Sequence, residues 1–211
     1  MDPLRRPLQS LVWGALLATI FGVTAVFVWS QLNASPDLPV ISQVPDFTLT
    51  NQSSQPFTKG SLLGHVTLAD IIFTRCAGPC PEMTRKMSNL QRILPSDPAI
   101  RLVTLTTDPG FDQPDVLKQY GSKFDANFAR WSFLTGPKRE IARVAVDGLK
   151  LIAEEKPPNE RTAPEDLFIH STIFVIVDKQ ARVRGSFDSS EPDFEKRVRA
   201  AVKKLLKEKG S

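Results

Sequence analysis

Residues 65–81 read HVTLADIIFTRCAGPCP, and their pattern is the strongest indication of the fold class in this sequence. Its first part, 65–74, is an apolar run rich in β-branched residues, which predicts a strand buried on both faces. After it, residues 81–94 place Met83, Met87, Leu90 and Leu94 at helical spacing. A buried strand that leads directly into a helix is the first half of a β-α-β unit. The sequence therefore predicts an α/β domain.

Strand and helix patterns alternate from this unit to the end of the chain. Strands are predicted over 100–107, 131–134, 172–177 and 181–187, and helices after Asp112, over 137–152 and over 190–209. Asp112 is the expected N-cap of its helix, with Pro114 in the first turn. Residues 178–180 would join the last two strands as a hairpin. This order predicts a thioredoxin-like sandwich with a mostly parallel central sheet.

A membrane anchor is predicted near the N-terminus. Residues 11–30 are twenty consecutive residues without a charge, and a helix of that length spans roughly the 30 Å of a bilayer's hydrocarbon core. Arg5 and Arg6 precede this segment, whereas the next Lys or Arg is Lys59. That asymmetry puts the N-terminus in the cytoplasm. A cleaved signal peptide and a buried core helix are the alternatives.

The predicted organisation has four parts: a cytoplasmic N-terminus over 1–10, a transmembrane anchor over 11–30, a tether over 31–44 and the thioredoxin-like domain over 45–211. Three prolines between residues 35 and 45 are typical of a tether. With only ten residues before the anchor there is no room for an organellar transit peptide. We therefore expect a bacterial inner membrane protein, single-pass, whose domain faces the periplasm.

Composition excludes several classes of protein. The 211 residues carry 27 Lys and Arg, 23 Asp and Glu and a net charge of +4. So small an excess gives no argument for a nucleic-acid partner. A hydrophobic content of 41% is enough for a packed core and excludes a disordered chain. Two cysteines cannot supply a four-thiolate zinc site or an iron–sulfur cluster.

The two cysteines, Cys76 and Cys80, lie where the buried strand gives way to the helix. The partial positive charge of a helix N-terminus favours thiolate over thiol, and Arg75 adds charge nearby. Three intervening residues leave room for both sulfurs to coordinate one ion, and soft thiolates select Cu(I). Zinc would require four ligands. A stabilising disulfide is the alternative, although a bridge that closes so short a loop stabilises little.

One histidine and two acids are further candidates for this site. His170 precedes the strand expected to lie beside the one that carries the thiols, so its imidazole could be a third ligand. Asp108 ends the second strand and should emerge at the same edge, where it could bond groups around the metal. Asp70 interrupts the buried strand and is a core polar group or a proton relay. His65, at the far end of that strand, is expected to be structural, and Met83 and Met87 to be core.

Several segments together resemble the Sco/SenC family, the membrane-anchored thioredoxin-like copper proteins of cytochrome c oxidase assembly. They are FTRC…CP over 73–81, LTTDP over 105–109, DQPDVL over 112–117, WSFLTG over 131–136 and HST over 170–172, with PDFTL over 45–49. Their order and spacing make the resemblance specific, and they cover most of 44–186.

The resemblance implies a ligand set and a function. Cys76, Cys80 and His170 match the family's copper ligands, and Asp108 matches an acid often found near them. The family implies copper delivery to the binuclear centre of oxidase subunit II, or reduction of that centre's cysteines so that another copper chaperone can load it. A thiol–disulfide oxidoreductase that acts on periplasmic protein cysteines is the enzyme alternative. A tethered interaction domain with a structural disulfide is the third.

Overall fold

The computed structural model of this chain describes residues 5–33, 38–151 and 172–208. His170 lies outside the described residues. The chain divides into two compact units, Met1–Asp37 and Leu38–Ser211.

The first unit consists of one helix, α1, which spans Arg5–Asn33. The side chains of residues 13–27 are all exposed, including those of Trp13, Phe21 and Val26. Across the part of the chain that the structure describes, no helix is both long and apolar enough to cross a membrane. The structure thus does not confirm the anchor predicted over 11–30.

The second unit is built on an eight-stranded sheet in the order β1-β8-β7-β4-β5-β6-β2-β3. The strands are β1 (Ser42–Gln43), β2 (Thr48–Asn51), β3 (Pro56–Thr58), β4 (Val66–Ile72), β5 (Ile100–Thr106), β6 (Trp131–Thr135), β7 (Ile173–Val177) and β8 (Arg182–Asp188). Only the pairs β4–β5 and β5–β6 are parallel, and the other five are antiparallel. The prediction of a mostly parallel sheet is therefore wrong, because the sheet is mixed.

The direction of β7 accounts for much of this difference. β7 follows β6 after a long connection, which can return a strand in either direction, and it pairs antiparallel with β4 through Thr67↔Val177 and Ala69↔Val175. The hairpin predicted at 178–180 is confirmed, because it joins β7 to the antiparallel β8. As a result, the first residue of β7 lies at the same edge of the sheet as the last residue of β4.

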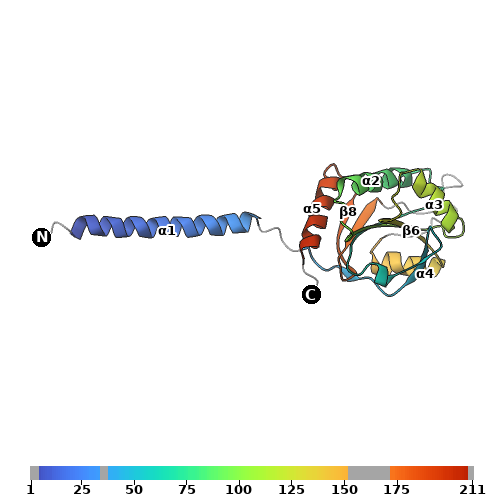
Figure 1. The fold of residues 1–211 in the computed structure, drawn as a ribbon, viewed down its shortest axis with the longest axis horizontal. Coiled ribbons are helices and arrows are strands. Elements are labelled where there is room, and N and C mark those ends of the chain that lie inside the picture. The colour runs from blue at the N-terminus through green and yellow to red at the C-terminus, as the bar shows by residue number, and fades with distance from the viewer. Residues whose placement is uncertain (1–4, 34–37, 152–171, 209–211) are drawn as a thin grey trace, which may run out of the picture. The chain divides into compact units, whose positions relative to one another are not determined.

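Helices cover both faces of the sheet (Figure 1). One face carries α2 (Cys80–Ile93), α3 (Pro114–Ser122) and α5 (Phe194–Lys207), whose apolar side chains share a core with Leu68, Leu102 and Phe174. The other face carries α4 (Lys138–Ala142) and the π-helical turn η2 (Arg143–Gly148), packed on Ala69, Val103 and Val175. A 3₁₀ turn, η1 (Lys59–Ser61), precedes β4. All seven residues of β4 are buried, as its apolar sequence predicts.

The second unit begins earlier than the domain boundary expected at residue 45. β1 pairs with β8 through Ser42↔Val183, and Val44 is fully buried. The guanidinium of Arg184 donates to the carbonyl oxygen of Leu38 at 2.7 Å. Residues 38–44, expected to belong to the tether, are therefore part of the folded unit.

Candidate metal centre

Cys76 and Cys80 lie together where β4 ends and α2 begins. Both side chains are buried, with 6% and 5% of their surface exposed, and they are not joined in a disulfide. They belong to the same core cluster as Met83 and Met87 of α2, which confirms that these methionines are core residues. The main-chain N–H of Gly78 donates to Sγ of Cys76 at 3.3 Å. Two thiols so placed can bind a soft ion or form a disulfide.

The two thiols have different electrostatic environments. A hydrogen bond with Cys76 raises the pKa of the Cys80 thiol far above its ordinary value, and burial raises it further. Cys80 is the first residue of α2, where the helix dipole was expected to favour a thiolate. Burial and the neighbouring sulfur outweigh the dipole at this position. Each sulfur has a main-chain N–H donor, that of Gly78 for Cys76 and that of Phe73 for Cys80.

Arg75 and Asp108 form an ion pair next to the thiols. Nη2 of Arg75 lies 2.6 Å from Oδ2 of Asp108, and the guanidinium lies 4.2 Å from the ring centroid of Phe111. Asp108 emerges at the same edge of the sheet as Cys76, as its position after β5 predicts. Because its carboxylate is paired with Arg75, Asp108 holds in place the residue that directly precedes Cys76.

Asp112 holds the loop that precedes Cys76. Its carboxylate accepts hydrogen bonds from the main-chain N–H of Thr74 at 3.1 Å, from the Thr74 hydroxyl and from the Thr106 hydroxyl. The hydroxyl oxygen of Thr106 in turn accepts the N–H of Asp108 at 3.0 Å. The side chain is fully buried, and burial raises its pKa.

This role of Asp112 corrects the sequence prediction. The N-cap of α3 is Gln113, and Asp112 caps nothing, because its carboxylate faces the ends of β4 and β5 instead. Sequence analysis missed it as a site residue. The signal in the sequence was a pair of threonines, Thr74 after β4 and Thr106 at the end of β5. Their hydroxyls are hydrogen-bond donors for a carboxylate that faces the two strand ends.

Asp70 lies in the middle of β4 and is fully buried. Oδ1 accepts a hydrogen bond from the hydroxyl of Thr104 at 2.6 Å, whereas Oδ2 has no hydrogen-bond partner among the described residues. Burial raises the pKa of Asp70 to about 7. Its charge also contributes to the raised pKa of Cys80, so the two groups interact electrostatically. Asp70 is thus a core polar group, and its hydrogen bonding is only half satisfied.

The described residues supply two of the three predicted metal ligands. Over 5–33, 38–151 and 172–208, no three His, Cys, Asp or Glu side chains come together as a metal site. His65 lies before β4, at the opposite end of that strand from Cys76, as expected. The remaining predicted ligand, His170, lies outside the described residues.

Comparison with known proteins places this fold and thiol pair in a family. The chain is 34% identical to the "SCO1 protein homolog" of Bacillus subtilis over 155 residues. This alignment covers 72% of this chain and 77% of that protein. It resembles the structure of BsSco, a member of the Sco family of cytochrome c oxidase assembly proteins with a disulfide switch, with a TM-score of 0.68 and 31% identity. That match covers 81% of this chain and 97% of BsSco.

A more distant structure shares the fold. Bradyrhizobium japonicum ScoI, solved with copper bound, has a TM-score of 0.64 and 24% identity, over 78% of this chain and all of that one. The family model SCO1/SenC matches residues 39–207, nearly the whole second unit. The chain therefore belongs to the SCO1/SenC family.

Proposed function

We propose that this domain binds copper through Cys76, Cys80 and His170 and acts in cytochrome c oxidase assembly. It would deliver copper to the binuclear centre of subunit II, or mature that centre together with another copper chaperone. Copper is the cargo of this function.

The burial of two thiols side by side at the end of β4 is the observation that carries the proposal. A pair of sulfur donors in an apolar surrounding favours a soft ion such as Cu(I), for which three ligands suffice. His170 is three positions before Ile173, where β7 begins. Because β7 runs antiparallel to β4, Ile173 lies at the edge where β4 ends and the thiols follow. A short reach from that edge would bring the imidazole to both sulfurs.

The relatives support copper and the oxidase connection. BsSco is described as a cytochrome c oxidase assembly protein, and the ScoI structure contains copper. Both share the fold of this chain, and BsSco shares 31% of its sequence. The chemistry of the thiol pair in this chain agrees with both.

The proposed location is the bacterial inner membrane, with residues 11–30 as a single anchor and the domain in the periplasm. The support comes from the sequence, because 11–30 contain no charge and the only nearby cationic residues precede them. A membrane-proximal copper domain would lie on the same side as the soluble part of its oxidase partner.

Metal analysis of the reduced protein under anaerobic conditions tests the function. After incubation with Cu(I) and gel filtration, the wild-type chain should retain one copper per molecule. Cys76→Ser and Cys80→Ser should each retain almost none, because either change leaves one thiol. Met83→Leu, a change in the same core cluster, should retain one copper and controls for packing. Equal retention by the cysteine variants and the wild type would refute copper binding at this site.

A thiol–disulfide oxidoreductase is the second candidate. The observation in its favour is the pairing of two buried thiols in hydrogen-bond contact at the start of α2, because such a pair can form and open a disulfide. An attacking thiolate beside a protonated partner is the arrangement that disulfide exchange uses. Turnover of a protein disulfide that is unchanged in His170→Ala, in a chain that retains no copper, would favour this function over copper delivery.

A further inference from the structure

A polar cavity lies at the end of the sheet opposite the thiols. Its volume is about 520 Å³. His65 precedes β4, Arg101 is the second residue of β5 and Arg130 directly precedes β6, and all three line this cavity. The three residues therefore come from the starts of three neighbouring strands, whereas Cys76 follows the end of β4.

Arg101 and Arg130 are neighbours across adjacent strands. Leu102 and Trp131 are register partners in the parallel pair β5–β6, and each arginine is the residue immediately before one of them. The main chain follows the same register, because the N–H of Leu102 donates to the carbonyl oxygen of Arg130 at 2.8 Å. Two arginines thus occupy adjacent register positions at one edge of the sheet, and both line the cavity.

Neither arginine is neutralised by an acid within the described part of the chain. No ion pair forms at either guanidinium there, and the Nε atoms of both are buried without a hydrogen-bond partner. Arg130 uses Nη2 to donate to the carbonyl oxygen of Pro95 at 3.0 Å. Like charges on neighbouring strands and unpartnered buried donors both destabilise a fold. An anion in this cavity would reduce the repulsion between the two arginines and would offer their guanidinium groups an acceptor.

His65 adds a third donor when its ring is protonated, a form that a bound anion favours. Its Nδ1 lies 2.8 Å from the carbonyl oxygen of Leu63, so in the neutral ring Nδ1 carries the proton and Nε2 is an acceptor, whereas in the protonated ring Nε2 is a donor as well. Burial lowers the pKa of His65, and repulsion by Arg101 lowers it further. Among the described residues that line the cavity, Asp97 is the one acid, and its Oδ1 accepts the N–H of Ala99 at 2.8 Å.

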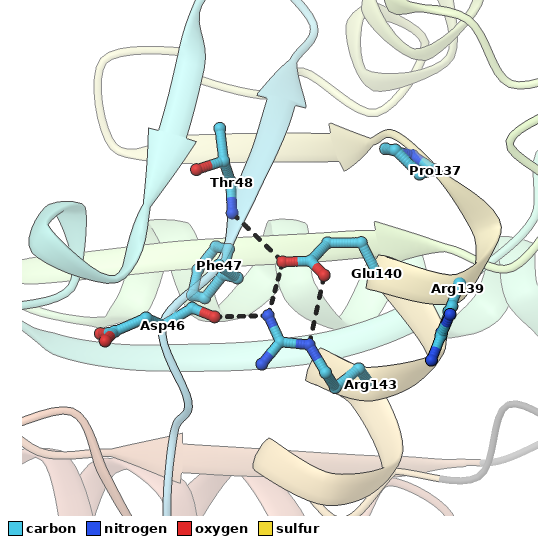
Figure 2. Close-up of a pocket in the computed structure, with 7 residues that line it drawn as sticks. All are labelled: Asp46, Phe47, Thr48, Pro137, Arg139, Glu140 and Arg143. Atoms are coloured by element: carbon cyan, nitrogen blue, oxygen red, sulfur yellow. Dashed lines mark hydrogen bonds and ion pairs between the residues drawn. The ribbon is translucent and has the colours of Figure 1, made fainter.

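In another cavity on the same domain, an arginine that lines it is paired with a carboxylate of the same lining. This cavity has a volume of about 730 Å³ and is lined by residues from β2, α4 and their flanking loops (Figure 2). There, Nη2 of Arg143 lies 2.6 Å from Oε1 of Glu140 and also donates to the carbonyl oxygen of Asp46. The same carboxylate accepts the N–H of Thr48. The cavity at Arg101 contains no such pair, so the two cavities differ in charge balance.

We propose that the cavity between His65, Arg101 and Arg130 binds a phosphate group. Two planar guanidinium groups match the oxygens of phosphate, and a protonated imidazole completes a set of donors around a tetrahedral anion. This site lies at the far end of β4 from the thiols and does not depend on the proposed copper function.

Titration of the full-length chain in detergent, in buffer free of phosphate and sulfate, tests the proposal. Inorganic phosphate should bind with one site per chain by calorimetry and should shift the imidazole resonances of His65. Arg101→Gln and Arg130→Gln should each weaken binding about tenfold or more, because each removes a charge-assisted contact. Arg85→Gln, which removes an exposed arginine on α2, should leave binding unchanged.

Glycerol 3-phosphate in a parallel titration distinguishes the source of the phosphate. Binding at least as tight as that of inorganic phosphate indicates a phosphate ester such as a lipid headgroup, whereas weaker binding indicates the free anion. The His65 shift in the wild type tests the site even if an arginine variant fails to fold. The proposal fails if neither probe saturates a site, if both arginine variants bind as the wild type does, or if saturation leaves His65 unshifted.

Discussion

The carboxylate of Asp112 accepts the main-chain N–H of Thr74, two residues before Cys76, at 3.1 Å. The same carboxylate binds the hydroxyl of Thr106 at the end of the neighbouring strand β5. One buried side chain therefore joins the two strand ends from which Cys76 and Asp108 emerge. This contact sets the position of the thiol loop relative to the sheet.

Replacement of Asp112 with alanine should destabilise the domain by about 3 kcal/mol or more, because two hydroxyls and one main-chain N–H lose their charged acceptor. Urea unfolding of the full chain measures the loss. Asp115→Ala provides the matched control: it removes an exposed aspartate from the first turn of α3, where an acid contributes about 0.3–1 kcal/mol. Equal losses in the two variants would contradict the role assigned to Asp112.

The buried carboxyl of Asp70 should make stability depend on pH. Its pKa is about 7 in the folded chain against an ordinary value of 3.8. Between these values the folded state holds a proton that the unfolded state has released, so the free energy of unfolding falls as pH rises across this interval. In the copper-free protein, Asp70→Asn should flatten that decline, measured by urea unfolding at several pH values. An unchanged slope would show that Asp70 ionises normally in the fold.

Long periodic segments of the sequence predicted their elements well. The buried strand at 65–74 and the helix at 81–94 correspond to β4 and α2, and the strand predicted over 100–107 corresponds to β5. Each of these segments has enough residues for its apolar spacing to be distinct. The positions of Cys76 and Asp108 at one edge followed from the same strands, since neighbouring parallel strands end at the same edge.

Short strands and strand direction could not be predicted in the same way. β1, β2 and β3 contain two, four and three residues, too few for an alternating pattern, so residues 38–44 gave no sign of belonging to the sheet. The direction of β7 depends on how the preceding connection runs, which apolar spacing does not encode. Asp112 satisfied the local rule for an N-cap, and only the tertiary fold places Thr74 and Thr106 against it.

Arg184 is the centre of a buried network of charged groups that joins the first and last described residues of the domain. Arg184, 5% exposed, bonds Asp178 at 2.8 Å and Glu208 at 2.7 Å and donates to the carbonyl oxygen of Leu38. Arg184→Met should destabilise the domain by about 3–5 kcal/mol, because it removes the buried partner of Asp178 together with the contacts to Glu208 and Leu38. Arg182→Met, which removes the more exposed partner of Asp178, should cost clearly less in the same urea titration. The reverse order would contradict this account of the network.

The proposal that His170 is a third copper ligand beside the two thiols is tested by Cu(I) affinity. Competition against a chromophoric Cu(I) chelator, with the reduced full chain under anaerobic conditions, compares His170→Ala with His65→Ala. Loss of a ligand should weaken Cu(I) binding by about 100-fold or more, since even loss of a ligand's supporting partner costs 10–100-fold. We therefore predict that His170→Ala binds at least about 100-fold more weakly than the wild type and that His65→Ala binds as tightly. Equal Cu(I) affinities for the wild type and His170→Ala would contradict the three-ligand site.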